Sequence, residues 1–145
     1  MTKPLKELIL RKYEPPSNLS PREACKRICL SLGLLQSDDS RETIVDIFQI
    51  LLEAHQKNRE LYLKDIKNML IEKGISEGIA ESNIRRHLRR LNEIGFVERV
   101  NKRYRFSQRE LPSDRFRKYI KKYVISDILD RIEEYLIFTE NIYKK

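Results

Sequence analysis

An apolar repeat at helical spacing is the clearest pattern in this chain, and it covers residues 84–94. Its members fall on one face of a helix and are Ile84, Leu88, Leu91 and Ile94. Arginines fill most positions between them, so the pattern predicts an amphipathic helix with a basic outer surface. Ser82 is the expected N-cap because its hydroxyl can accept a hydrogen bond from the first turn, and Gly95 is expected to end the helix.

Strand chemistry begins directly after Gly95. The apolar residues that follow are aromatic or β-branched and are Phe96, Val97, Val100, Tyr104 and Phe106. Asn101 and Lys102 separate two short runs of these residues and suit a tight reversal of the chain. The segment therefore predicts a β-hairpin that is as basic as the helix before it.

Three further helices are predicted before this pair. They cover residues 20–33, 40–57 and 63–73. Ser20 followed by Pro21 is typical of a capped helix start. Leu61 or Tyr62 can form a short edge strand, and residues 1–19 are expected to be a short helix or an arm that packs on the rest of the molecule.

The last segment contains neither glycine nor proline from residue 113 to residue 142 and predicts one helix. A helix of about 30 residues would be about 45 Å long, which exceeds what a small domain can cover. Its apolar residues recur every four positions, so we expect two copies of the chain to pair through them. The expected dimerisation residues are Ile120, Val124, Ile128, Ile132 and Leu136. The alternative is a segment that folds back as two helices over the first 35 residues.

These elements predict a mainly helical fold of the α+β class in three parts. The parts are an N-terminal helical extension over 1–39, a central domain over 40–110 and a C-terminal dimerisation helix over 111–145. Apolar runs are too short to cross a bilayer, and the first residues do not resemble a secretory signal. We therefore expect a cytoplasmic protein with no membrane partner.

Positive charge is concentrated in the predicted helix and hairpin. The chain has a formal net charge of +8, and residues 81–109 carry nine Arg or Lys against three Glu, a local excess of +6. All nine except Lys102 are arginines, which suit bidentate contacts to phosphate and guanine. A heat-adapted, solvated surface is the alternative, but it would mix the two signs more evenly. The charge therefore favours a nucleic acid as partner.

A basic helix followed by a basic hairpin indicates a winged helix-turn-helix domain. Residues 82–106 resemble the end of this fold in bacterial and archaeal transcription regulators of the MarR, ArsR and PadR kinds. The shared pattern is hLxxLxxxGhhxR followed by a short wing that returns to an aromatic residue. The matching residues are Leu88, Leu91, Gly95, Phe96, Val97, Arg99 and Tyr104. The resemblance implies double-stranded DNA as partner and a long C-terminal helix that joins two copies.

The predicted helix would enter the major groove with its N-terminal half. The expected DNA-binding residues are Ser82, Asn83, Arg85, Arg86, Arg89, Arg90, Lys102 and Arg103. The first five and Arg90 lie on the helix, whereas Lys102 and Arg103 belong to the hairpin tip. For any one arginine, contact with a phosphate is a commoner role than base recognition.

Other chemistry is sparse in this sequence. Cys25 and Cys29 share a helix face at a spacing unusual for zinc, so we expect buried free thiols and no metal or cofactor. No phosphate-binding loop or hydrolase motif occurs, and we expect a protein that is not an enzyme. The sequence thus favours a homodimeric, sequence-specific transcription regulator. The alternatives are a winged-helix module that binds another protein and, with fewer stacking aromatics to support it, an RNA-binding protein.

Overall fold

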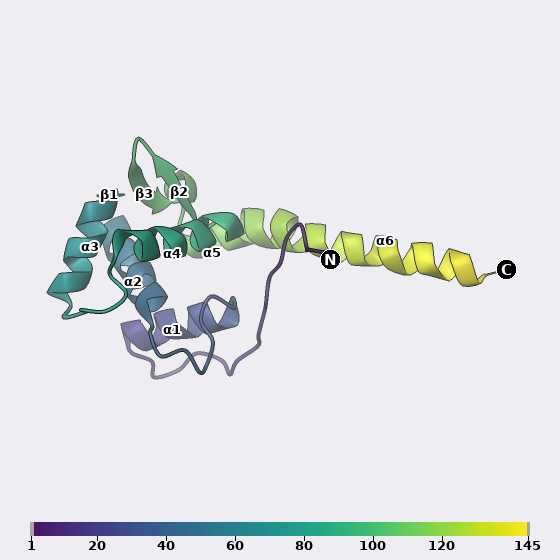
Figure 1. The fold of residues 1–145 in the computed structure, drawn as a ribbon, viewed down its shortest axis with the longest axis horizontal. Helices are drawn as coiled ribbons and strands as arrows, with labels where there is room; N and C mark the ends of the chain where they lie inside the picture. The colour runs from purple at the N-terminus through teal and green to yellow at the C-terminus, as the bar shows by residue number, and fades with distance from the viewer. Residues whose placement is uncertain (1, 145) are drawn as a thin grey trace.

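The computed structural model describes residues 2–144 and is mainly helical with a small antiparallel sheet (Figure 1). This confirms the expected mainly helical α+β class. Its first four helices are α1 (Pro21–Ser31), α2 (Thr43–Gln56), α3 (Leu63–Glu72) and α4 (Glu81–Ile94). Each of them lies within or close to a segment whose apolar spacing predicted it.

Two of these helices begin at residues other than those expected. The Ser20 hydroxyl accepts a hydrogen bond from the Glu23 amide at 3.1 Å, as predicted for α1. The N-cap of α4 is Ala80 rather than Ser82, which lies inside the first turn. The Asn83 side chain donates to the Gly78 carbonyl at 2.7 Å and holds the preceding turn against the helix. Likewise, α2 begins at Thr43 rather than near residue 40.

The sheet consists of three strands in the order β1-β3-β2. They are β1 (Leu61–Tyr62), β2 (Val97–Val100) and β3 (Arg103–Phe106). Between β2 and β3, Asn101 and Lys102 have φ angles of 51° and 67°, as a two-residue type I′ turn requires. β1 pairs with β3 through Leu61 opposite Tyr104. The predicted hairpin and edge strand are both confirmed.

One hydrophobic core joins α1, the helices α2 to α4, the sheet and the start of the C-terminal helix. Phe48 of α2 lies at its centre, with ring centroids 6.4 Å from Phe96 and 5.8 Å from Phe106. Cys25 and Cys29 of α1 are buried in the same core. α1 is therefore an integral layer of the fold and is not an appendage to the central domain.

Residues 2–19 form an arm without helix, which decides between the two forms expected for this segment. Arg11 holds the arm against α1. Its amide donates to the Ser31 carbonyl at 2.9 Å, and its guanidinium donates to the Leu30 carbonyl at 2.8 Å. Farther along, Lys6 forms an ion pair with Asp127 at 3.1 Å, so the arm also reaches the C-terminal helix.

The C-terminal segment follows the short 3₁₀ turn η1 (Ser107–Arg109) and runs as one continuous helix. Its parts are α5 (Pro112–Arg115), the π-helical stretch η2 (Phe116–Ile125) and α6 (Ser126–Tyr143). Figure 1 shows α6 projecting beyond all other elements. The segment does not fold back, which excludes the two-helix alternative. Among the described residues, no helix is both long and apolar enough to cross a membrane.

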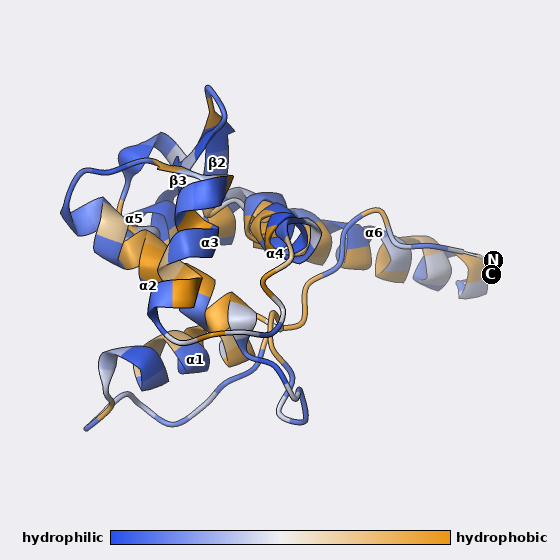
Figure 2. Cartoon of the chain, turned by 60° about the vertical axis from the view of Figure 1, so that its left-hand side comes forward, coloured by the Kyte–Doolittle hydropathy of each residue, from blue (hydrophilic) through white to orange (hydrophobic). Residues whose placement is uncertain are grey.

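Ile120 and Val124 belong to the core and are not free to form a dimer contact. They are 0% and 5% exposed, so the prediction that they contact a second copy is wrong. The π-helical winding of η2 takes more residues per turn than an α-helix and keeps side chains four positions apart on the same inner side. By contrast, α6 buries none of its described side chains, and Figure 2 shows apolar residues along it. Ile132 and Leu136 are more than half exposed.

The burial of Ile120 predicts that substitutions at two adjacent positions change the free energy of unfolding by different amounts. Ile120→Ala should lower the free energy of unfolding by about 2–4 kcal/mol, because it leaves a cavity in the core. Lys121→Ala changes an exposed neighbour on the same helix and should change that energy by less than about 0.5 kcal/mol. Urea denaturation of both variants measures the difference. Equal, small effects would contradict the burial of Ile120.

Candidate nucleic-acid interface

The outer face of α4 presents an uninterrupted stripe of polar and basic side chains. Its members are three or four positions apart and are Ser82, Arg85, Arg86 and Arg89, all exposed. The opposite face is buried through Ile84, His87, Leu88, Leu91 and Ile94. Because the core fixes the inner face, the arginine stripe has only one orientation, toward solvent.

The hairpin adds a further arginine beside this stripe. Residues opposite each other in β2 and β3 share a face, so Arg99 lies on the same side as Tyr104, and its guanidinium carbon is 5.6 Å from that ring centroid. A groove of about 320 Å³ separates the hairpin from α4 and is lined by Arg85, Arg89 and Arg99, among others. Arg99 was not among the predicted DNA-binding residues. Side chains alternate along a strand, so Arg99 could have been predicted to lie on the same face as Val97.

Arg103 lies on the other face of the hairpin. It is opposite Val100, and strand alternation directs its side chain away from the groove. Its guanidinium carbon is 5.7 Å from the centroid of the Tyr62 ring of β1. Lys102, by contrast, is exposed in the turn. The structure therefore keeps Lys102 at the hairpin tip and separates Arg103 from the arginines of α4.

Two of the predicted contacts on α4 form hydrogen bonds within the protein. The Arg90 guanidinium donates to the Leu34 carbonyl at 2.8 Å, and burial lowers the pKa of this side chain below its ordinary value. It connects α4 to the loop after α1. The Asn83 amide is held by Gly78, as described above. Hence neither side chain is free in the way that the sequence suggested.

The remaining arginines of α4 have only weak attachments. Arg85 lies 3.9 Å from Glu81 one turn earlier, and Arg86 donates to the Asn83 side-chain oxygen at 2.9 Å. Within residues 2–144, Arg89 forms no hydrogen bond or ion pair. Exposed pairs of this kind contribute about 0.3–0.5 kcal/mol, so a phosphate or a base can displace them at little cost.

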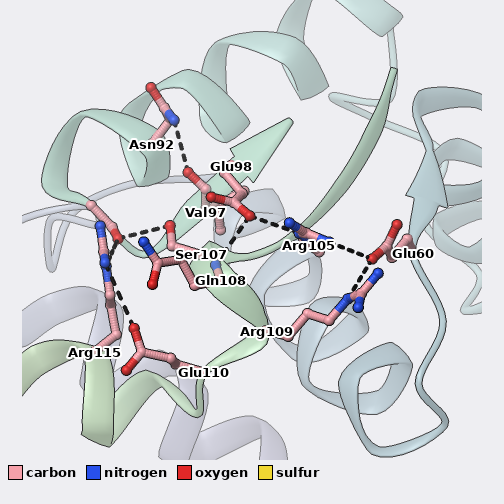
Figure 3. Close-up of polar contacts among 11 residues, drawn as sticks. Glu60, Asn92, Val97, Glu98, Arg105, Ser107, Gln108, Arg109, Glu110 and Arg115 are labelled. Atoms are coloured by element: carbon pink, nitrogen blue, oxygen red, sulfur yellow. Dashed lines mark hydrogen bonds and ion pairs between the residues drawn. The ribbon is translucent and has the colours of Figure 1, made fainter. Parts of the chain in front are cut away.

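A network of ion pairs supports the base of the hairpin (Figure 3). Arg105 donates to Glu98 at 2.7 Å and to Glu60 at 2.8 Å, and Glu60 also accepts from Arg109 at 2.9 Å. These two arginines hold the pKa of the Glu60 carboxyl below its ordinary value. The network joins β2, β3 and the residue before β1, so it fixes the sheet that carries Arg99.

The end of α4 is joined to the hairpin and to the C-terminal helix at one atom. The Gly95 carbonyl oxygen accepts hydrogen bonds from the Ser107 hydroxyl at 3.0 Å and from Arg115 Nε at 2.8 Å, as Figure 3 shows. Nearby, the Asn92 amide donates to the Val97 carbonyl at 2.8 Å. α4, the hairpin and the helix that begins at Pro112 thus share one junction.

Buried titratable groups of the core lie outside the exposed stripe. Burial lowers the pKa of His87 to about 4, helped by the charges of Arg86 and Arg90, and its Nδ1 atom is buried without a hydrogen-bond partner among the described residues. Burial raises the pKa of Cys29 to about 12. Both cysteines are free and buried, as predicted. In the described part of the chain, no group of three or more His, Cys, Asp or Glu side chains is placed to bind a metal.

No protein-family model matches this chain, and no curated protein or solved structure matches it either.

The buried imidazole predicts a pH dependence of stability. Because the folded pKa of His87 lies below the ordinary value of 6.5, the unfolded chain binds the extra proton first as the pH falls. The contribution of neutral His87 to the free energy of unfolding is fully present above pH 6.5 and is lost as the pH falls toward 4. Urea unfolding of the wild type should therefore show about 1–2 kcal/mol less stability at pH 5 than at pH 7.5. His87→Gln should flatten this difference. An equal loss of stability at pH 5 in the wild type and in His87→Gln would show that other titratable groups cause it.

Proposed function

We propose that this protein binds double-stranded DNA in a sequence-specific manner, as a winged helix-turn-helix regulator of transcription. The order of elements supports this proposal. A short strand lies between α2 and α3, α4 follows a turn, and a hairpin follows α4 in a sheet of order β1-β3-β2. In a winged helix-turn-helix, the helix before the hairpin is the one that enters the major groove.

The observation that carries the proposal is the exposed stripe on α4 with Arg99 and Lys102 beside it. The major groove of B-DNA is wide enough for an α-helix, and arginine can pair with both acceptors of a guanine edge. Because the inner face of α4 is buried, its arginines face outward together on a rigid element. A rigid arrangement loses less conformational entropy on binding than flexible side chains on a loop would.

The structure suggests separate roles for the basic residues. Arg85, Arg86 and Arg89 are proposed to contact bases or phosphates in the groove. Lys102, at the tip of the hairpin, is proposed to contact the neighbouring backbone. Arg90 and Arg103 are proposed to support the fold, because one donates to a backbone carbonyl and the other lies against Tyr62. We propose no catalytic role for any of these residues.

Two copies are proposed to act together. The exposed apolar side chains of α6, among them Ile132 and Leu136, support pairing through this helix. A symmetric pair would present two α4 helices to DNA, with half-sites separated by one helical turn or a multiple of it. A role as a protein-interaction module remains the competing proposal, because a basic helix can also contact an acidic protein.

A double substitution on α4 tests the proposed contacts. Arg86→Ala with Arg89→Ala should weaken binding to duplexes selected from a random pool by about tenfold to a hundredfold. The slope of log affinity against log salt should also become shallower by about two, because up to two phosphate contacts are lost. Fluorescence anisotropy at several salt concentrations measures both quantities.

The matched control removes two positive charges from another exposed region. Lys57→Ala with Arg59→Ala lies in the turn after α2 and should change the affinity by no more than about twofold. Equal losses of DNA affinity in the two double variants would show that only the net charge matters and would contradict recognition by α4. Elution of the wild type from heparin and from random duplex at low salt would favour the protein-interaction module instead.

A further inference from the structure

α6 carries an apolar stripe, and none of its described side chains is buried. Stepping 100° per residue places an apolar stripe on one side of it. The stripe consists of Ile128, Leu129, Ile132, Tyr135, Leu136, Ile142 and Tyr143, whereas the exposed Ile137 and Phe138 lie outside it. Leu129 and Leu136 are 58% and 56% exposed. Most helical stability in proteins comes from packing of such a face, so α6 requires a partner along its length.

Charge along the C-terminal helix changes sign near residue 126. Residues 115–125 contain five Arg or Lys and no acid, a net charge of +5. Residues 126–143 contain five Asp or Glu and one Arg, a net charge of −4. The lysines at 121 and 122 are exposed on η2, and the acids of α6 are exposed as well. The helix is therefore a basic segment followed by an acidic one.

We infer that two copies of this chain pair through α6 in antiparallel orientation, with the acidic segment of each copy beside the basic segment of the other. A parallel pair would place each acidic segment beside an identical one, and facing like charges are unfavourable. An antiparallel pair brings Glu140 of one copy toward Lys121 and Lys122 of the other. In this register the first half of α6 lies beside the same half of the other copy and packs its apolar side chains there, while the second half lies beside the lysines of η2.

This arrangement has a consequence for the distance between the two proposed DNA-binding surfaces. The paired segment of each copy includes η2 as well as α6, and the two domains lie at opposite ends of the helix pair. The junction at Gly95 fixes α4 relative to the C-terminal helix. The length of the paired segment therefore sets the separation of the two α4 helices. The inference rests on the proposed pairing of two copies and is independent of DNA binding.

Charge reversal distinguishes the two orientations without DNA. One variant carries Glu133→Lys and Glu140→Lys, and the other carries Lys121→Glu and Lys122→Glu. For an antiparallel pair, each variant alone should raise the dimer dissociation constant by roughly tenfold, since like charges then face each other at the changed positions in both halves. An equimolar mixture of the two should restore the wild-type value to within about threefold, because the new lysines of one variant then face the new glutamates of the other. Analytical ultracentrifugation at low salt measures all of these constants.

The other outcomes overturn the inference in distinguishable ways. A wild type that stays monomeric at every concentration would contradict the pairing itself. In a parallel pair, the Glu133→Lys, Glu140→Lys variant would associate more tightly with the wild type than with the Lys121→Glu, Lys122→Glu variant. That preference would contradict the antiparallel orientation. Since α6 buries none of its described side chains, the first variant should keep the circular dichroism and urea midpoint of a folded domain. Neither failure affects the test of the arginines on α4.

Discussion

The relative positions of α4, the hairpin and the C-terminal helix depend on the carbonyl oxygen of Gly95. It accepts hydrogen bonds from Ser107, at the end of the hairpin, and from Arg115, at the start of the C-terminal helix. Gly95 has a φ of 115°, and a Cβ atom there would lie only 3.0 Å from the Tyr119 ring. Only glycine meets both conditions without strain. The stripe on α4, the arginine of the hairpin and the direction of α6 are thereby fixed relative to one another.

Net charge alone overstates the size of the proposed interface. Arg90 and Arg105 lie in the same basic segment as Arg89, yet each is partly buried and committed to a carbonyl or to carboxylates. These internal arginines hold the loop after α1 and the base of the hairpin. The basic residues that stay exposed are fewer. Apart from Arg109, which pairs with Glu60, they lie on α4, on the near side of the hairpin and at its tip. The proposed interface is therefore narrow and rigid.

Periodicity predicted most of the fold because burial of apolar faces decides which segments become helices. The hairpin could be predicted equally well, because Asn101 and Lys102 suit a tight turn and adopt its left-handed conformation. The sequence could not show that α1 joins the same core or that Ile120 is buried, because both depend on packing between distant segments. Periodicity also did not predict the π-helical winding of η2. The expected DNA-binding residues included Arg103 at the hairpin tip and not Arg99, although strand alternation places Arg99 on the side of α4. The residues exposed on α4 followed from helical geometry alone.

α4 and the adjacent hairpin are proposed to form the surface that meets DNA. NMR chemical-shift mapping can test this with ¹⁵N-labelled protein titrated with a duplex selected for binding. The largest amide shifts should fall within residues 81–90 and 99–102, while those of α6 should stay near their free values at constant dimer concentration. Shifts confined to α1, the arm or the outer face of α6 would contradict the proposed DNA surface.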